Sequence, residues 1–266
     1  MRNLNMLLAW IFAAAMPVHA DELRIGGTGA ALGSMQLLAN AYAKLQPQTR
    51  ITVLPSMGSN GSIKAVMAGA IELSVSARPL TEAEIKAGAS EYEYGRTPFV
   101  FAVSASNPVS ALSTQDLVDI YAGTTTQWPN GSKIRVVLRP VGDSDSELIK
   151  AISPAMRAAK DSAEKRPGML FTVTDQETAS SIEKIPGAIG PSTLALLLSE
   201  KRALKALAFN GVTPDAKTIE SGQYPLYKTL TLITNQNPTP DTQGFVAFVL
   251  SPAGKKILQQ NGHWIK

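Results

Sequence analysis

The stretch Gly58–Gly61 has the composition of an anion-binding loop, because small and hydroxyl-bearing residues precede a predicted helix. A β-branched run at 51–54 predicts a short strand, and apolar residues at helical spacing over 63–70 predict the helix. The first N–H groups of a helix have no partner within it, and glycines let a ligand approach the backbone. We therefore expect Ser59 and Asn60 to contact a small anion, with Ser59 also a candidate helix cap. The alternative is an ordinary capped helix start, which the same residue types produce.

A second candidate group follows a predicted strand at 134–138 and consists of Arg139, Asp143, Ser144 and Asp145. An arginine can direct two N–H groups at one oxyanion. Binding residues commonly follow the carboxyl ends of parallel strands, so this group is expected to face the same ligand as the first. The aspartates can instead be first-turn acids of the next helix, and Ser144 fits the start of a capping box.

Two further positions belong to the candidate site. The glycine-rich stretch 26–31 lies between a predicted strand and a predicted helix, and it lacks the spacing of a dinucleotide fingerprint or a P-loop. It is either a tight turn or a second helix start directed at the same ligand. Arg78 lies two residues beyond another predicted strand. Two roles remain open for it, namely ligand contact or an ion pair with Asp143 or Asp145.

Alternating strands and helices must bring these loops together. Over residues 23–75 the pattern is strand, helix, strand, helix, strand, which predicts a doubly wound parallel layer and an α/β fold class. Capped helix starts are predicted at Thr81, Ser113 and Ser251. Further strands are predicted at 98–104, 134–138, 204–209 and 224–234.

Residues 1–20 are predicted to form a cleavable signal peptide, with Arg2 as its positive start, an apolar core at 7–16 and small residues before the cleavage site. The mature chain is expected to begin at Asp21. The apolar core is too short to span a bilayer, and no later stretch is long enough. Because the sequence contains no cysteine, we expect no lipid anchor, no disulfide and no thiolate metal site. These features predict a free periplasmic protein.

The composition argues against nucleic acid as a partner, because 25 Lys and Arg face 21 Asp and Glu without any basic block. After the predicted signal peptide the only histidine is His263, and no metal-ligand spacing occurs. Ser144 beside Asp145 lacks a base and is not a nucleophile site. We therefore expect no catalytic residue, no metal site and no cofactor.

Seven stretches, taken in order, resemble the substrate-binding proteins of phosphate ABC importers, and together they extend over nearly all of the predicted mature chain. They are GTGAAL (27–32), GSNGSIK (58–64), SARPL (76–80), LVDIYAG (117–123) with Trp128, PGAIG (186–190), SGQYPL (221–226) and FVLSPAG (248–254). This resemblance implies a type II periplasmic binding protein fold, with two doubly wound α/β lobes joined by two crossovers. The implied lobes are residues 21–98 with 233–266, and residues 99–232.

The resemblance also implies how the ligand is held. An oxyanion would lie in the cleft between the lobes and be contacted by two loops of the first lobe and one arginine of the second. The contacts implied in this sequence are the backbone N–H groups of Ala31 and Leu32, the Ser59 hydroxyl with neighbouring N–H groups, and the Arg139 guanidinium.

Three departures from the family pattern leave the ligand open. Ala31 lacks the hydroxyl that the first loop commonly carries, and Ala77 replaces a buried aspartate of some members. At 142–145 the family's Gly-Ser-Gly-Thr is Gly-Asp-Ser-Asp. A carboxylate beside an anion opposes binding unless it is protonated, turned away or used as an acceptor. We expect Asp143 to point inward and Asp145 to cap the helix.

Three functions therefore remain open. The first is a monomeric periplasmic binding protein that delivers a small oxyanion, phosphate foremost, to an inner-membrane ABC permease. The second is a binding or sensor protein of the same fold, for a ligand whose amine or hydroxyls the aspartates accept. The third is an enzyme on the same scaffold, against which the missing base and metal ligands argue.

Overall fold

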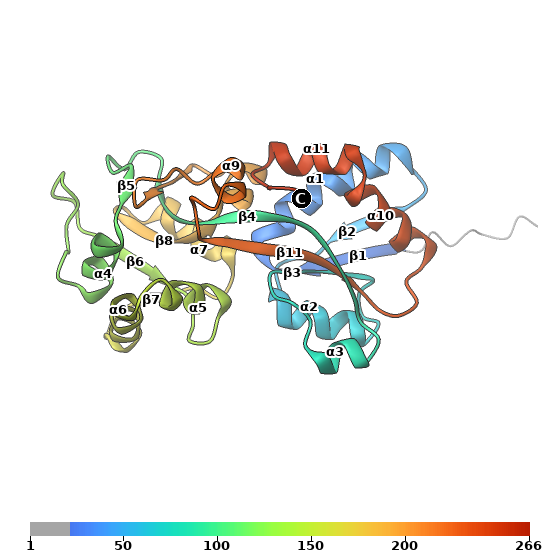
Figure 1. Ribbon diagram of the computed structural model, residues 1–266, viewed down its shortest axis with the longest axis horizontal. Coiled ribbons are helices and arrows are strands. Elements are labelled where there is room, and N and C mark those ends of the chain that lie inside the picture. The colour runs from blue at the N-terminus through green and yellow to red at the C-terminus, as the bar shows by residue number, and fades with distance from the viewer. Residues whose placement is uncertain (1–21) are drawn as a thin grey trace, which may run out of the picture.

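The computed structural model describes residues 22–266 of the 266-residue chain (Figure 1). The predicted signal peptide and the predicted mature start at Asp21 lie outside the described residues. Within residues 22–266, every helix is too short or too polar to cross a membrane.

A mixed sheet of nine strands runs through the molecule in the order β2-β1-β3-β11-β4-β8-β6-β7, and β9 also pairs with β4. These strands are β1 (Glu22–Gly27), β2 (Arg50–Val53), β3 (Leu73–Ser76), β4 (Ser90–Ser104), β6 (Arg135–Leu138), β7 (Leu170–Phe171), β8 (Ala188–Thr193), β9 (Leu204–Ala206) and β11 (Tyr227–Thr234). A separate parallel pair is formed by β5 (Ala111–Leu112) and β10 (Ala208–Phe209).

The strand directions confirm part of the predicted layer. β1 is parallel to both β2 and β3, as the alternation of strands and helices predicted. β11 is antiparallel to β3 and to β4, so this half of the sheet is mixed. The prediction of one strand over 204–209 was wrong, because β9 pairs with β4 whereas β10 pairs with β5.

The helices cover the sheet in two groups, one on each half of the molecule (Figure 1). In the first half, α1, α10 and α11 pack together, and in the second half α6 packs on α4 and α5. The helices are α1 (Gly29–Leu45), α2 (Gly58–Met67), α3 (Glu82–Lys86), α4 (Thr114–Ala122), α5 (Ser144–Ala151), α6 (Pro154–Lys165), α7 (Asp175–Lys184), α8 (Leu194–Ser199), α9 (Ala216–Glu220), α10 (Pro240–Leu250) and α11 (Pro252–Gln260).

Local sequence explains where several helices begin. The predicted capping boxes at Thr81 and Ser113 are confirmed. Each hydroxyl accepts from the N3 amide, while the N3 carboxylate accepts from the backbone N–H of the capping residue. Gly123 ends α4 with φ at 82°, a left-handed conformation that glycine adopts without strain. The predicted cap at Ser251 is also confirmed, with Pro252 following in the first turn of α11.

β4 is the strand on which the two halves meet. Up to Pro98 it pairs with β11, and from Phe99 onward it pairs with β8. The lobe boundary predicted at 98/99 falls at this change of partner. The boundary predicted at 232/233 falls inside β11, whose ladder partners are β3 and the first part of β4. We propose that the second crossing lies near residue 227, so that β11 belongs to the first lobe.

Each half has its own apolar core. Leu23, Met35 and Phe245 belong to one cluster of buried side chains, and Phe99 and Trp128 belong to another. Trp128 is buried, and its indole N–H donates to the carbonyl of Gly187 at 3.0 Å. Separate cores allow the halves to keep their shapes while the angle between them changes.

Candidate functional site

A cleft of about 500 Å³ lies between the two halves, and most of the predicted site residues line it. Ser59, Asn60, Arg78, Arg139, Asp143 and Ser144 belong to its lining, whereas Ala31, Leu32 and Asp145 lie outside it. The remaining lining residues are Thr28, Ser56, Met57, Gly58, Gly142, Val173, Thr174, Asp175 and Lys228.

The start of α2 supplies one wall of the cleft. The helix begins at Gly58 without a side-chain cap, so the prediction that Ser59 caps it was wrong. The Ser59 hydroxyl instead accepts from the amide of Ala77 at 3.0 Å, which leaves its proton free to donate. The first N–H groups of α2 therefore have no cap from within the helix and can receive an anion.

Arg78 lines the cleft but is engaged with a carboxylate on its own side. Its guanidinium donates to both oxygens of Glu84 at 2.9 and 2.8 Å, and its Nε–H donates to Asn60 Oδ1 at 2.6 Å. This bidentate bond holds the pKa of Glu84 well below its usual range, at about 2. The predicted alternative of an ion pair with Asp143 or Asp145 was wrong, because Glu84 from the capping box of α3 takes that place.

Arg139 is the buried cation of the opposite wall, with only 5% of its surface exposed. β6 delivers it at its carboxyl end, and Nη1 donates to the carbonyl of Thr172 at 3.0 Å. Nη2 and Nε donate to the two oxygens of Asp143 at 3.0 and 3.3 Å. Burial alone would lower the pKa of Arg139, but Asp175, Asp143 and Asp145 outweigh it and raise that pKa.

Asp143 lines the cleft, as predicted, but the prediction that Asp145 caps α5 was wrong. Asp143 caps α5, since its Oδ1 accepts from the amide of Asp145 at 2.9 Å, and Ser144 is not the cap. Asp145 is 1% exposed and forms an ion pair with the ammonium of Lys228. Burial, together with Asp175 and Asp143, raises the pKa of Asp145 despite the attraction of Lys228. Helix geometry gives the cap to Asp143, because Asp143 directly precedes the first turn of α5 whereas Asp145 lies within that turn.

Sequence reasoning missed two charged residues of the cleft, Asp175 and Lys228. Asp175 is the first residue of α7, and its carboxylate lies 3.8 Å from the Lys228 ammonium. Lys228 is 3% exposed, and burial would lower its pKa, but Asp145 and Asp175 outweigh burial and raise it. A signal for Asp175 was present in the Thr174-x-x-Glu177 capping box, which follows a short apolar run. A lone lysine inside a β-rich run gives no comparable signal.

The first glycine-rich loop contributes less to the cleft than the family resemblance implied. Ala31 is fully buried inside the first half, and Leu32 lines a separate surface hollow. Thr28 is the residue of this loop that lines the cleft. The start of α1 is covered by Gln176 of α7, whose side-chain amide donates to the carbonyl of Gly29 at 2.9 Å.

The cleft, together with the buried Asp145 that pairs with Lys228, therefore holds a dense group of opposite charges. Arg139 and Lys228 face Asp143, Asp145 and Asp175, while the charge of Arg78 is matched by Glu84. Among residues 22–266, no cluster of histidine, cysteine or carboxylate side chains has the arrangement of a metal site. The arrangement offers hydroxyls, helix N–H groups and two buried cations to a polar ligand, together with carboxylates that can accept hydrogen bonds from it.

Two α/β halves that enclose a polar cleft, joined by neighbouring strands, define the architecture of a type II periplasmic binding protein. The family model described as a PBP superfamily domain matches residues 14–253. The chain belongs to the PBP superfamily.

Similar proteins and solved structures are binding proteins of the same kind. The phosphate-binding protein PstS of Bacillus subtilis (strain 168) is 26% identical over 255 residues, covering 92% of this chain and 80% of the relative. A substrate-binding protein from Clostridium perfringens, solved with bound phosphate, has a TM-score of 0.74 at 21% identity, covering 92% of this chain and all of that chain. The periplasmic molybdate-binding protein of Azotobacter vinelandii has a TM-score of 0.64 at 14% identity, and the match covers 92% of this chain and 99% of that chain.

Proposed function

We propose that this protein is a periplasmic solute-binding protein that captures a small oxyanion, phosphate foremost, and presents it to an ABC importer. The observation that carries the proposal is the cleft, in which the start of α2 faces the buried Arg139. Helix-terminal N–H groups and a forked guanidinium both favour a tetrahedral oxyanion. The names of the relatives support phosphate, and the molybdate-binding relative shows that the fold also serves other oxyanions.

Binding without chemistry fits the residues of the cleft. Ser56, Ser59 and Ser144 are the serines that line it, and none of them forms a hydrogen bond with a histidine in the described part of the chain. The one histidine there, His263, is fully buried, and its ring nitrogen contacts carbonyls of the C-terminal segment. We therefore propose that the protein binds its ligand without changing it chemically, and that it uses no catalytic residue and no cofactor.

One observation favours a second candidate function. Two buried cations are surrounded by three carboxylates, so a fully ionised dianion would add to an existing excess of negative charge. A ligand that carries a proton or an ammonium group beside its oxyanion would donate hydrogen bonds to those carboxylates. The alternative is therefore a binding or sensor protein of the same fold for a zwitterion of this kind.

Calorimetry on the purified protein separates the two candidates. The ligands are phosphate, sulfate, molybdate and 2-aminoethylphosphonate, with Arg139→Ala as the variant that removes the clamp. Phosphate should bind with one site per chain and lose most of its affinity in the variant. Tighter binding of 2-aminoethylphosphonate than of phosphate would favour the second candidate, and absence of heat with every ligand would contradict both.

A further inference from the structure

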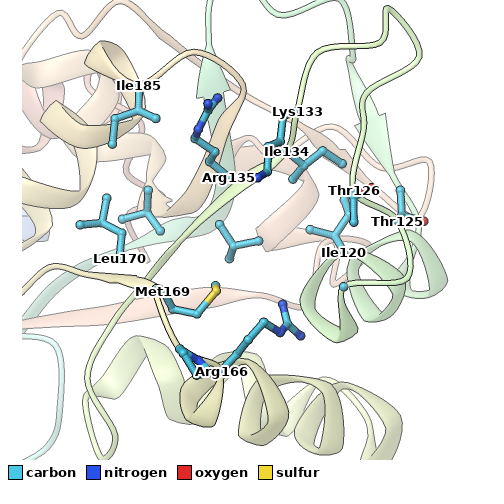
Figure 2. A pocket seen from close by; sticks show the side chains of 15 residues that line it. Ile120, Thr125, Thr126, Lys133, Ile134, Arg135, Arg166, Met169, Leu170 and Ile185 are labelled. Atoms are coloured by element: carbon cyan, nitrogen blue, oxygen red, sulfur yellow. The ribbon is translucent and has the colours of Figure 1, made fainter.

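A second cavity, of about 390 Å³, lies in the half of the molecule that carries β6 (Figure 2). Its wall is formed by residues 133–137 of the β6 segment, by the end of α4, and by the stretch that leads into β7. Within the described chain, the residues that line it and the residues that line the cleft are different sets. The volume lies in the range of roughly 300–1,000 Å³ that is typical of small-molecule sites.

The body of this cavity is aliphatic. Figure 2 shows Met169 reaching into it from the β7 side and Ile120 facing it from α4. Ile134 and Val136 are buried members of the same wall. A straight hydrocarbon chain would displace water from these side chains. The removal of apolar surface from water would favour its binding.

The charged groups at the rim are all positive. Lys133, Arg135 and Arg166 line the cavity, and among the described residues no carboxylate does. Arg135 donates one N–H to the carbonyl of Pro186 at 2.7 Å. Nη2 of Arg166 donates to the last carbonyls of α4, those of Tyr121 and Ala122, at 2.8 and 2.7 Å.

Arg166 is held in place beside the cavity and keeps hydrogen-bond donors for a ligand. The guanidinium lies directly over Gly123, so that a side chain at this position would contact it at 3.0 Å, and this fixes its place beside the cavity. In the part of the chain that the structure describes, its Nε–H and Nη1 N–H groups form no hydrogen bond. A partly buried arginine with donors left over is a strong site for a carboxylate.

We propose that this cavity is a second ligand site, which binds an organic monoanion with a short aliphatic chain. Its carboxylate accepts hydrogen bonds from Arg166, with Lys133 adding favourable charge, and its chain packs along Ile134 and Met169. An inorganic anion would leave the aliphatic wall unfilled, and an ammonium of the same length would meet three cations. The proposal is independent of the ligand in the cleft.

Calorimetry with butanoate, hexanoate and octanoate tests the site, with octanol and octylammonium as probes of charge. Octanoate should bind with one site per chain, and affinity should rise by up to about fourfold for each added methylene. Octanol should bind at least fivefold more weakly than octanoate, and octylammonium should not bind. Equal binding of octanoate and octylammonium, uptake without saturation, or no binding of octanoate would overturn the proposal.

Variants localise the binding. Arg166→Gln should weaken octanoate binding at least fivefold, whereas Arg157→Gln, an exposed position on α6, should leave it unchanged. Because Arg166 also holds the end of α4, Met169→Glu gives a second test that spares this contact. The added carboxylate should abolish octanoate binding while Met169→Gln retains it. Phosphate affinity should be the same in all of these proteins, and equal octanoate binding in all of them would place the ligand elsewhere.

Discussion

Arg139 connects the sequence, the cleft and the proposed ligand at the scale of a single residue. Thr172 and Asp143 hold its guanidinium in a buried position, so it loses little freedom when it meets an anion. A charge-assisted fork to a desolvated oxyanion contributes more than a neutral hydroxyl contact. Arg139 should therefore be the largest single contributor to binding in the cleft.

The substitution Arg139→Ala should weaken phosphate binding by at least ~2 kcal/mol, whereas Ser59→Ala should cost roughly 1 to 1.5 kcal/mol. Calorimetry gives both values, and thermal unfolding of each variant checks that it is folded. Equal costs for the two substitutions, or no cost for either, would mean that the ligand contacts other residues.

Asp143 competes with the ligand for the same guanidinium. Asparagine caps a helix about as well as aspartate, so Asp143→Asn keeps the start of α5 while removing the charge. We expect this variant to bind phosphate more tightly than the parent. The parent should lose affinity as pH rises through the second ionisation of phosphate, because a carboxylate opposes a dianion more than a monoanion. Asp143→Asn should flatten that profile, and parallel profiles for the two proteins would contradict this role.

His263 gives the fold a dependence on acid that is separate from the ligand. The ring is fully buried, its Nδ1 lies 3.0 Å from the carbonyls of Leu258 and Asn261, and burial lowers its pKa from 6.5 to about 4. Between these two values the unfolded chain binds the proton and the folded chain does not, so stability rises with pH across this window. Acidification from pH 7 to 4 should cost about 3 kcal/mol from this group alone.

Urea unfolding at several pH values, for the parent and for His263→Gln, isolates this contribution. The difference in free energy of unfolding between the two proteins should change across pH 4 to 6.5 and stay constant above pH 7. A constant difference over the whole range would show that His263 does not titrate in this way.

At the scale of elements, α7 is one of the helices that the sequence analysis did not predict, and its start positions Asp175. Thr174 accepts from the amide of Glu177, and the Glu177 carboxylate returns bonds to the amides of Val173 and Thr174. Losing a cap of this kind costs about 1 kcal/mol. Thr174→Ala should therefore lower the free energy of unfolding by about that amount, while Thr174→Ser should retain most of it. Chemical denaturation measures both, and equal losses would show that the hydroxyl is not the cap.

The elements that the sequence predicted are those with short-range signals. The strands at 51–54 and 134–138 and the caps at Thr81 and Ser113 depend on residues a few positions apart, which periodicity and capping rules detect. The direction of β11, the split between β9 and β10 and the pair of Lys228 with Asp145 depend on distant segments. Nothing local in the sequence reports such contacts, so the charge balance of the cleft could not be predicted.

At the scale of the whole molecule, the two halves touch where the starts of α1 and α7 meet. Gln176 donates to the carbonyl of Gly29 and to the carboxylate of Glu200, and the Thr193 hydroxyl donates to the carbonyl of Ala30. These contacts lie beside the cleft. They join Gly29 and Ala30 to residues that lie more than 140 positions further along the chain. A change in this contact should therefore alter the angle between the halves and, through it, the cleft.

Gly29 offers a direct test, because the approach of the two halves leaves no room for a side chain there. A Cβ at this position would lie 2.2 Å from Oε1 of Gln176 and 2.9 Å from Cβ of Asp175. The glutamine can turn away, but the aspartate can move only with the start of α7, so Gly29→Ala should push the halves apart. Overpacking of this kind costs typically ~1–3 kcal/mol. Phosphate affinity should fall by a similar amount, and small-angle scattering should show a larger radius of gyration.

Asn40→Ala is the control, since Asn40 is an exposed residue of α1 that belongs neither to the cleft nor to the contact with α7. Alanine favours a helix over both glycine and asparagine, so neither substitution should weaken α1. Weaker phosphate binding and a larger radius in Gly29→Ala alone would link the contact between α1 and α7 to closure of the cleft. If both variants bind phosphate as the parent does, the halves close without this contact, and the affinity of the cleft is set by the residues that line it.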